Sequence, residues 1–417
     1  MKDEIRSIAE QCSQPGPGMP QSALLQLRPY IEGFFDPNWL NNKLRYYEEW
    51  ASKNSDPFLQ RSLLHRPLGF NMLVASIWAA RDWENICKED PTFRPPMGAK
   101  RLASIASSLA VLELHAGQLL DLEARIHMRE RLQATDLVWG VINELHTFAY
   151  FIRKGAEVQP HFLQKASPRE ITVRWQGVDI PVQCKVKNPG AGRLISQDVV
   201  TTLSCYIARD ARVVGKKLLV RIGTTGPIRQ DDVEFLRHQV SGGVGSGMGP
   251  ALVTYRDRTF TVKSEPLSGQ FTPESVQDYL SSFAFHVGMV VGEPTPDKNA
   301  YDVFVVVGIE AYPMETPWRS LRDSIKEGAR QLRNGPPGII AIYYTDPVSD
   351  FEALCPAPGY MKVFVGQLID KFPHVGAVMM ASEPNLQLPE GVDPGRVRIY
   401  YKKPWPFPFN FLPDESD

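Results

Sequence analysis

Residues 170–185 form the segment that most constrains the fold of this chain, because their alternation predicts a tight β-hairpin turning at Gln176-Gly177. A two-residue turn there places Trp175 opposite Val178. The same register, carried to the open end, places Glu170 opposite Gln183. The hairpin therefore gathers an acid, an amide and, two residues further on, the amine of Lys185.

The two faces of this hairpin differ completely in polarity. Side chains alternate along a strand, so residues two apart share a face. The apolar face carries Ile171, Val173, Trp175, Val178, Ile180, Val182 and Cys184. The polar face carries Glu170, Thr172, Arg174, Asp179, Pro181, Gln183 and Lys185. The structural interpretation of this pattern is a half-exposed antiparallel pair, and the functional interpretation is a metal site at the open end of the polar face.

These residues resemble the PD-(D/E)XK nuclease superfamily, in which an acid on one strand precedes Glu-x-Lys or Gln-x-Lys on the next. The Gln-x-Lys form here is Gln183-Cys184-Lys185, which is similar to that of Mrr-like restriction endonucleases. The resemblance covers about residues 136–222. It implies a restriction-endonuclease-like sheet, with Glu170 where the family usually has aspartate. The side chain of Glu170 carries the same charge on an arm one methylene longer than that of aspartate.

The family also implies a glutamate on a preceding helix. A helix is predicted over 136–153 by an apolar stripe at helical spacing, with Glu144 at the stripe's edge. Taken alone, Glu144 would be a solvated boundary residue. Gly155 is a plausible helix stop, and a short strand is expected at 157–159, which completes the family's order of helix, glycine and strand before the hairpin.

Phosphodiester hydrolysis needs an activated water and a place for negative charge, and Mg²⁺ or Mn²⁺ bound by oxygen ligands supplies both. The resemblance implies that Glu144, Glu170 and Gln183 hold the metal. It also implies that Lys185 orients the attacking water or neutralises the phosphate. Because Gln183 offers only a neutral oxygen, we expect weaker metal binding than at a site with glutamate there.

Two further residues of the polar face are interpreted as structural. Arg174 and Asp179 oppose each other across the strands and are expected to form an exposed ion pair. Asp179 lies four residues before Gln183, about 13 Å along the strand, which is too far to share an ion. Pro181 raises the alternative of a bulge that would shift the register by one residue.

The whole chain is predicted to be α/β: a helical N-terminal region followed by a restriction-endonuclease-like mixed sheet flanked by helices, with an α/β C-terminal extension. A helix over 196–207 and a strand over 217–222 are expected to close the core locally. The predicted divisions are 1–130 (helical), 131–225 (nuclease-like core), 226–300 (an insert containing a glycine-rich loop at 242–249), 301–400 (an extension of the sheet or a degenerate second copy) and 401–417 (a proline and aromatic tail).

Bulk composition permits a nuclease without requiring one. The 417 residues carry a net charge of −1, which excludes a uniformly basic nucleic-acid coat. A local basic patch is expected from Lys165, Arg169, Lys185, Lys187 and Arg193. The 5 cysteines lack CxxC spacing, which argues against a disulfide framework or a zinc site. We expect no apolar run of membrane length, no signal peptide and a cytoplasmic location.

Three functional classes follow. The leading one is a Mg²⁺-dependent DNA endonuclease, with RNA as the alternative substrate and restriction or phage defence as the role implied by the resemblance. The second is a nucleic-acid-binding protein that keeps the nuclease scaffold without catalysis. The third is a structural α/β scaffold protein. A homodimer or a protein partner bound through the tail is compatible with each class.

Overall fold

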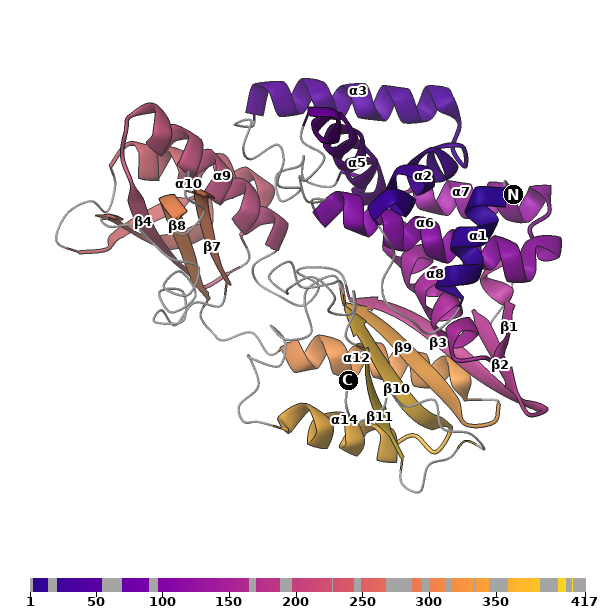
Figure 1. The fold of residues 1–417 in the computed structure, drawn as a ribbon. Helices are drawn as coiled ribbons and strands as arrows, with labels where there is room; N and C mark the ends of the chain where they lie inside the picture. Colours follow the sequence, from indigo (N-terminus) through magenta and orange to yellow (C-terminus); the bar gives the residue numbers. More distant parts are fainter. Residues whose placement is uncertain are drawn as a thin grey trace. The chain divides into compact units, whose positions relative to one another are not determined.

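The computed structural model describes most of the chain as helices and strands of a mixed α/β protein (Figure 1). The described residues are 3–13, 21–54, 70–89, 97–164, 170–187, 197–226, 228–243, 249–267, 287–294, 301–311, 317–333, 335–344, 359–382, 397–402 and 407. The chain divides into two compact units. Unit 1 comprises Met1–Leu44, Asn71–Asn188 and Trp318–Asp417, and unit 2 comprises Arg45–Phe70 and Pro189–Pro317.

Helices make up the N-terminal part of unit 1, as the apolar spacing predicts. They are α1 (Asp3–Cys12), α2 (Gln21–Glu32), α5 (Met72–Glu89), α6 (Met97–Ala116), α7 (Leu122–Gln133) and α8 (Val138–Arg153), and α3 (Pro37–Asn54) crosses the boundary between the units. The helical stretch from Met97 to Gln133 is two helices rather than one. It breaks at a 3-10 turn over Gly117–Leu119, after which the Asp121 carboxylate caps α7 by accepting a hydrogen bond from the Ala124 amide at 2.8 Å.

One described stretch, Gly98–Leu119, is long and apolar enough to cross a membrane by length and composition alone. The expectation that no run reaches that length was therefore wrong for this stretch. Most of it is buried within the protein, and Leu102, Ile105 and Leu109 are almost inaccessible to solvent. This is the burial pattern of a core helix in a globular unit.

The sheet of unit 1 is built from segments far apart in the sequence. Among the described residues it has six strands in the order β1-β2-β3-β9-β10-β11. Their bounds are Glu157–Pro160 (β1), Ile171–Trp175 (β2), Val178–Lys187 (β3), Gly338–Tyr344 (β9), Val375–Ser382 (β10) and Val397–Tyr401 (β11). Strand β2 is antiparallel to its neighbours β1 and β3, while β3, β9 and β10 are mutually parallel and β11 is antiparallel to β10.

Helices cover both faces of this sheet. Helix α8 packs on one face, where its Trp139 ring lies against Tyr343 of β9. Helices α12 (Pro317–Leu332) and α14 (Tyr360–Asp370) pack together on the other face, over the alternate β9 side chains Ile340 and Ile342 (Figure 1). All seven residues of β9 are buried, as expected of a central parallel strand with helices on both sides.

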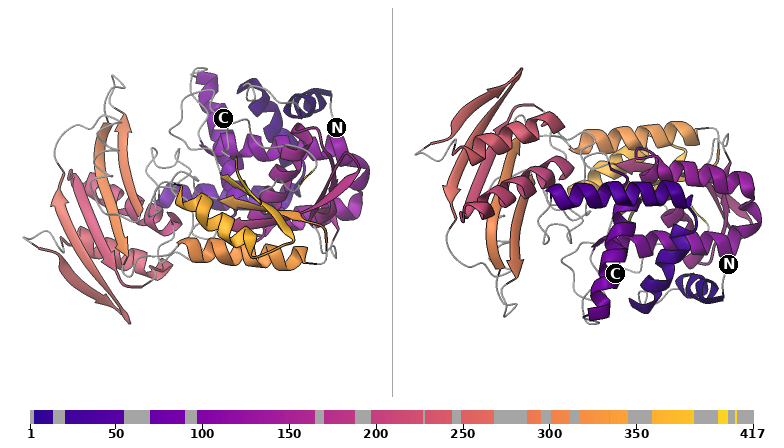
Figure 2. Two further views of the ribbon diagram at one scale, coloured as in Figure 1. Left: turned by 90° about the horizontal axis from the view of Figure 1, so that it is seen from below. Right: turned by 90° about the horizontal axis from the view of Figure 1, so that it is seen from above.

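Unit 2 has its own sheet of five strands among the described residues, in the order β5-β6-β4-β8-β7. The strands are β4 (Leu218–Thr224), β5 (Ala251–Tyr255), β6 (Arg258–Pro266), β7 (Val287–Pro294) and β8 (Tyr301–Ala311). Helices α9 (Gln197–Val213) and α10 (Gln230–Ser241) pack on one face of this sheet and share an apolar core with it (Figure 2).

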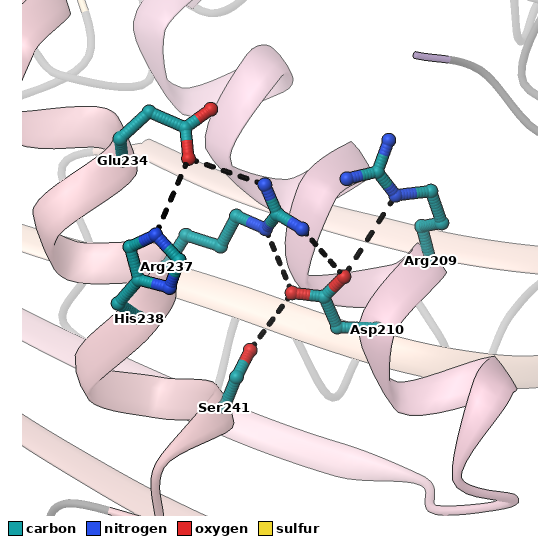
Figure 3. A network of polar contacts seen from close by, with 6 residues as sticks. All are labelled: Arg209, Asp210, Glu234, Arg237, His238 and Ser241. Carbon is teal, nitrogen blue, oxygen red and sulfur yellow. Dashed lines mark hydrogen bonds and ion pairs between the residues drawn. The ribbon is translucent and has the colours of Figure 1, made fainter. Parts of the chain in front are cut away.

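A network of polar contacts links α9 to α10. The Asp210 carboxylate of α9 accepts hydrogen bonds from Arg237 Nε at 2.7 Å, Arg237 Nη2 at 3.0 Å and Ser241 Oγ at 2.8 Å (Figure 3). Arg237 also lies 3.1 Å from Glu234, and the guanidinium groups of Arg237 and Arg209 both lie over the Tyr206 ring. These contacts fix the angle between the two helices.

The expectation that the core closes locally was wrong. The helix and strand predicted after the hairpin exist, as α9 and β4, but β4 pairs with β6 and β8 in the sheet of unit 2. The strand beside β3 is instead β9, more than 150 residues later in the chain. Strand periodicity predicts that a segment is a strand but carries no information about which strand it pairs with. Part of the expected extension, β9 and β10, continues the same sheet, whereas β8 does not.

Several sequence expectations fall outside the described residues. The glycine-rich loop is described only at its ends, and the tail only at Tyr401, Lys402 and Phe407. The same holds for Lys165, Arg169 and Arg193 of the expected basic patch, and for Ser196, the first residue of the helix expected over 196–207.

Candidate active site

The hairpin has the predicted turn and register. Gln176 and Gly177 both have positive φ values, 48° and 79°, as a two-residue turn of type I′ requires. Trp175 pairs with Val178, and the pairing continues without a bulge to Ile171 and Val182. Glu170 and Gln183 come one step beyond that last pair. Pro181 does not disturb the register, and it lies one residue before β3 begins to pair with β9.

Glu170 reaches across to β3 beside the Gln-x-Lys segment. Its Oε2 accepts a hydrogen bond from the backbone amide of Cys184, and its Oε1 lies 3.8 Å from Lys185 Nζ. Both side chains are largely shielded, with 25% of Glu170 and 15% of Lys185 exposed. The structure therefore brings together the acid and the lysine that the sequence pairs.

Gln183 lies between these residues in sequence and is buried, with 1% of the residue exposed. It pairs with Ile340 of β9, and Lys185 pairs with Ile342. Both isoleucines belong to the core formed with α12 and α14, so this polar strip runs along the face of the sheet that those helices cover.

Glu144 approaches the same strand from α8. Its neighbour Asn143 donates hydrogen bonds to the backbone carbonyls of Lys185 at 3.0 Å and Ala341 at 3.2 Å, which ties this turn of the helix to β3 and β9. Glu144 is 4% exposed, so the interpretation of this residue as a solvated boundary side chain was wrong. The apolar stripe places it at an edge, but the hairpin and α7 cover that edge.

The two oxygens of Glu144 have different surroundings. Oε1 receives Arg131 Nη2 of α7 at 2.7 Å. Oε2 is buried and has no hydrogen-bond partner among the described residues. A buried carboxylate oxygen without a partner is costly, and such atoms in native proteins call for an explanation such as an ion that binds there.

Burial raises the pKa of both glutamates of the cluster. Burial raises the pKa of Glu144 to about 7, although Arg131 and Lys185 act against the rise. Burial also raises the pKa of Glu170, against the opposing effects of Lys185, the Cys184 amide and Arg131, while the charge of Glu327 on α12 adds to the rise. A bound cation would reverse both shifts, because it favours the ionised carboxylates.

Sequence reasoning did not find Arg131, Asn143 or Glu327. Arg131 lies 13 residues before Glu144 on a different helix, and Glu327 lies on α12, which follows unit 2 in the sequence. No spacing rule relates such residues, because only the tertiary fold brings them together. Asn143 had one available signal, since an amide within an otherwise apolar helical stripe needs buried partners.

Other candidates lie apart from this cluster or serve another purpose. Arg174 and Asp179 form the predicted cross-strand ion pair, with Nε to Oδ1 at 2.7 Å and Nη2 to Oδ2 at 3.1 Å. The acidic residues Asp302 and Glu310 belong to β8 in the other sheet.

The oxygen-bearing side chains of the cluster that a metal could bind are the carboxylates of Glu144 and Glu170 and the amide of Gln183. Within the described part of the chain, no three His, Cys, Asp or Glu side chains lie together as a complete metal site. The orphaned Glu144 Oε2 nevertheless fits a hard divalent cation, which prefers oxygen ligands and retains several waters when it is Mg²⁺.

No protein-family model matches this chain, and neither a curated protein nor a solved structure matches it. The geometry of the cluster is therefore the basis for a functional proposal.

Proposed function

We propose that this protein is a metal-dependent nuclease that hydrolyses DNA phosphodiester bonds, with Glu144, Glu170, Gln183 and Lys185 at its active site. The observation that carries the proposal is the ion pair of Glu170 with Lys185, together with a buried Glu144 that interacts electrostatically with both and whose Oε2 has no hydrogen-bond partner among the described residues. A cation bound at Oε2 would account for the missing donor.

The order of elements in unit 1 supports the same proposal. Helix α8 is followed by the antiparallel strands β1, β2 and β3, and then, after unit 2, by helix α12 and the parallel strand β9. This is the order that the PD-(D/E)XK resemblance implies, with unit 2 inserted after the strand that carries Lys185. An insertion of this kind leaves the sheet intact, because the chain leaves after β3 and returns through the helix that packs beneath it.

Each residue has a distinct role in the proposed reaction. Glu144 Oε2, Glu170 and the Gln183 amide oxygen would hold a divalent cation, which supplies an acidified water and charge neutralisation when bound. Lys185 lies 3.8 Å from the Glu170 carboxylate, where its ammonium group can orient the attacking water and offset the charge that develops on the phosphate. The reaction adds one water across a P–O bond and releases two ends, with no cofactor consumed.

A cleavage assay tests this function directly. Supercoiled plasmid is incubated with the protein in Mg²⁺, Mn²⁺ or EDTA, beside Lys185→Ala and the control Lys362→Ala, which changes an exposed lysine of α14. We expect cleavage that EDTA abolishes, a loss of about 100-fold or more in Lys185→Ala, and a change of a few-fold at most in Lys362→Ala. Cleavage that survives both EDTA and Lys185→Ala would reject the proposed site. A parallel arm with single-stranded RNA distinguishes the two substrates.

A second candidate is a nucleic-acid-binding protein that keeps this scaffold without catalysis. The observation that favours it is that protein donors already hold both glutamates: Arg131 bonds Glu144, and the Cys184 amide bonds Glu170. Filter binding in EDTA separates the candidates, because this class predicts nucleic-acid binding without cleavage in any divalent ion. A cytoplasmic location and a role in restriction or phage defence are part of the nuclease proposal.

A further inference from the structure

Two arginines of α7 make similar ion pairs with glutamates on neighbouring helices. Arg125 Nη2 lies 2.8 Å from Glu113 Oε1 on α6, and Arg131 Nη2 lies 2.7 Å from Glu144 Oε1 on α8. The pairs have the same donor, the same acceptor atom and nearly the same length. Their other carboxylate oxygens differ, and this difference separates a structural pair from one that serves a site.

Both carboxylate oxygens of Glu113 have hydrogen-bond donors. Its Oε2 accepts a hydrogen bond from the Tyr30 hydroxyl at 2.7 Å, so both oxygens have protein donors. Glu144 Oε2 has none within the described chain, although it is buried. Arg125 thus completes a closed network of three side chains, whereas Arg131 leaves its glutamate half satisfied.

Arg131 is itself held in place by a second contact. Its Nη1 donates to the backbone carbonyl of Phe162 at 3.3 Å, and the Phe162 amide donates to the backbone carbonyl of Glu170 at 2.9 Å. The two ends of one planar guanidinium therefore bridge α8 to the segment that leads into β2. An arginine suits this position because its fork presents two donors in a fixed geometry, which an ammonium group does not.

We propose that Arg131 is a positioning residue: it holds Glu144 by Oε1 so that Oε2 remains available to ligate a divalent cation. This inference rests on the proposed function. Ligating carboxylates are commonly oriented by an outer hydrogen bond on the oxygen that the metal does not take, and loss of that bond weakens metal binding. The opposite role, in which Arg131 occupies the place of the cation and must be displaced, would leave no reason for Oε2 to be free.

Metal titration without nucleic acid tests the proposal. Calorimetric Mn²⁺ titrations compare the full-length wild type with Arg131→Gln, Arg131→Lys and the matched control Arg125→Gln. We expect the wild type to bind Mn²⁺, Arg131→Gln to bind at least about tenfold more weakly, and Arg131→Lys to recover part of the affinity. Arg125→Gln should keep the wild-type affinity even where it lowers the melting temperature, because Glu113 is not a ligand.

The outcomes separate this inference from the proposed function. A wild type that binds no Mn²⁺ rejects the metal site itself. A wild type that binds, with unchanged or tighter binding in Arg131→Gln, rejects only the positioning role, and tighter binding would show that Arg131 competes with the cation. Far-UV circular dichroism identifies folded variants. If Arg131→Gln does not fold, Arg131→Lys decides, because the loss of one fork donor should still weaken binding several-fold while Arg125→Lys does not.

Discussion

The two units each contain a cluster of charged side chains around a carboxylate, and the clusters differ in how completely that carboxylate is paired. In unit 2, both oxygens of Asp210 accept hydrogen bonds, from Arg237 and Ser241 (Figure 3). In unit 1, Glu144 has one donor and one buried oxygen without any partner among the described residues. Protein donors therefore pair both oxygens of Asp210 but only one oxygen of Glu144 within the described residues.

The pKa directions of the two carboxyls follow this difference. Hydrogen bonds and the charge of Arg237 outweigh partial burial and hold the pKa of Asp210 below its ordinary value. At Glu144 burial dominates and raises the pKa to about 7. A carboxylate that lowers its pKa through its partners stabilises the fold at neutral pH, and one that raises it opposes folding there. Buried, underpaired carboxylates are found where function requires them.

The largest effect is expected from adding a third carboxylate to the unit 1 cluster. In Gln183→Glu, a carboxylate replaces the neutral amide of a residue that is 1% exposed and lies next to Glu170 in the hairpin register. Without a divalent ion we expect a loss of about 3 kcal/mol or more in unfolding free energy, and Mg²⁺ should restore much of it by binding more tightly than in the wild type. Urea unfolding with and without Mg²⁺ measures both.

Gln159→Glu is the matched control, because it makes the same change at a half-buried position of β1 in the same sheet. It should show little Mg²⁺ dependence. If Gln183→Glu is destabilised and Mg²⁺ does not restore it, Gln183 is not a ligand and the non-catalytic alternative gains support.

The local parts of this site were predictable from sequence, and the distant ones were not. Gln176-Gly177 defines the hairpin turn and hence the register that sets Glu170 beside Gln183, because turn type and strand alternation are properties of adjacent residues. The neighbour of β3 was not predictable, since the segments at 217–222 and 338–344 both have the character of strands and only the fold selects the second. Arg131 was missed for the same reason, as its partner Glu144 is on another helix.

A pH dependence of about 3 kcal/mol is expected from Glu144. Its pKa is about 7 in the folded protein against 4.5 ordinarily, so the folded state holds the extra proton and stability falls as pH rises from 4.5 to 7. A shift of that size corresponds to about 3 kcal/mol. The decline should be flatter in Glu144→Gln, which has no carboxyl to titrate. Urea unfolding of both proteins between pH 4.5 and 7.5, without divalent ions, checks this. Equal slopes would show that Glu144 is ionised and satisfied at neutral pH.

A smaller loss is expected in the cluster of unit 2. Asp210→Asn removes the charge that Arg237 and Ser241 bind, and we expect unit 2 to lose about 1–3 kcal/mol, the usual range for hydrogen bonds to a charged group. The pKa of Asp210 is lowered, so the contribution it makes at neutral pH should disappear as pH falls below its ordinary value of 3.8. Hydrogen exchange of α9 and α10 amides measures the loss locally.

Glu234→Gln is the control for that measurement. Glu234 bonds the same Arg237 at 3.1 Å but is 54% exposed, so its replacement should cost well under about 1 kcal/mol. Mn²⁺ affinity should be unchanged in both variants. A change in Mn²⁺ binding in Asp210→Asn would mean that the two clusters are coupled, and it would contradict a purely structural role for Asp210.

The smallest effect is expected at the exposed ion pair on the same hairpin as the candidate site. Asp179 and Arg174 are 48% and 40% exposed and lie at the turn end, away from Glu170. Asp179→Asn should therefore cost less than about 1 kcal/mol and leave any cleavage rate within a few-fold of wild type. The measurements are a melting curve and the plasmid assay in Mg²⁺. A folded Asp179→Asn protein without cleavage would move the catalytic acid to the turn end of the hairpin. Glu170 would then have only a structural role, as the acceptor of the Cys184 amide, just as Asp210 is the acceptor of Arg237 and Ser241.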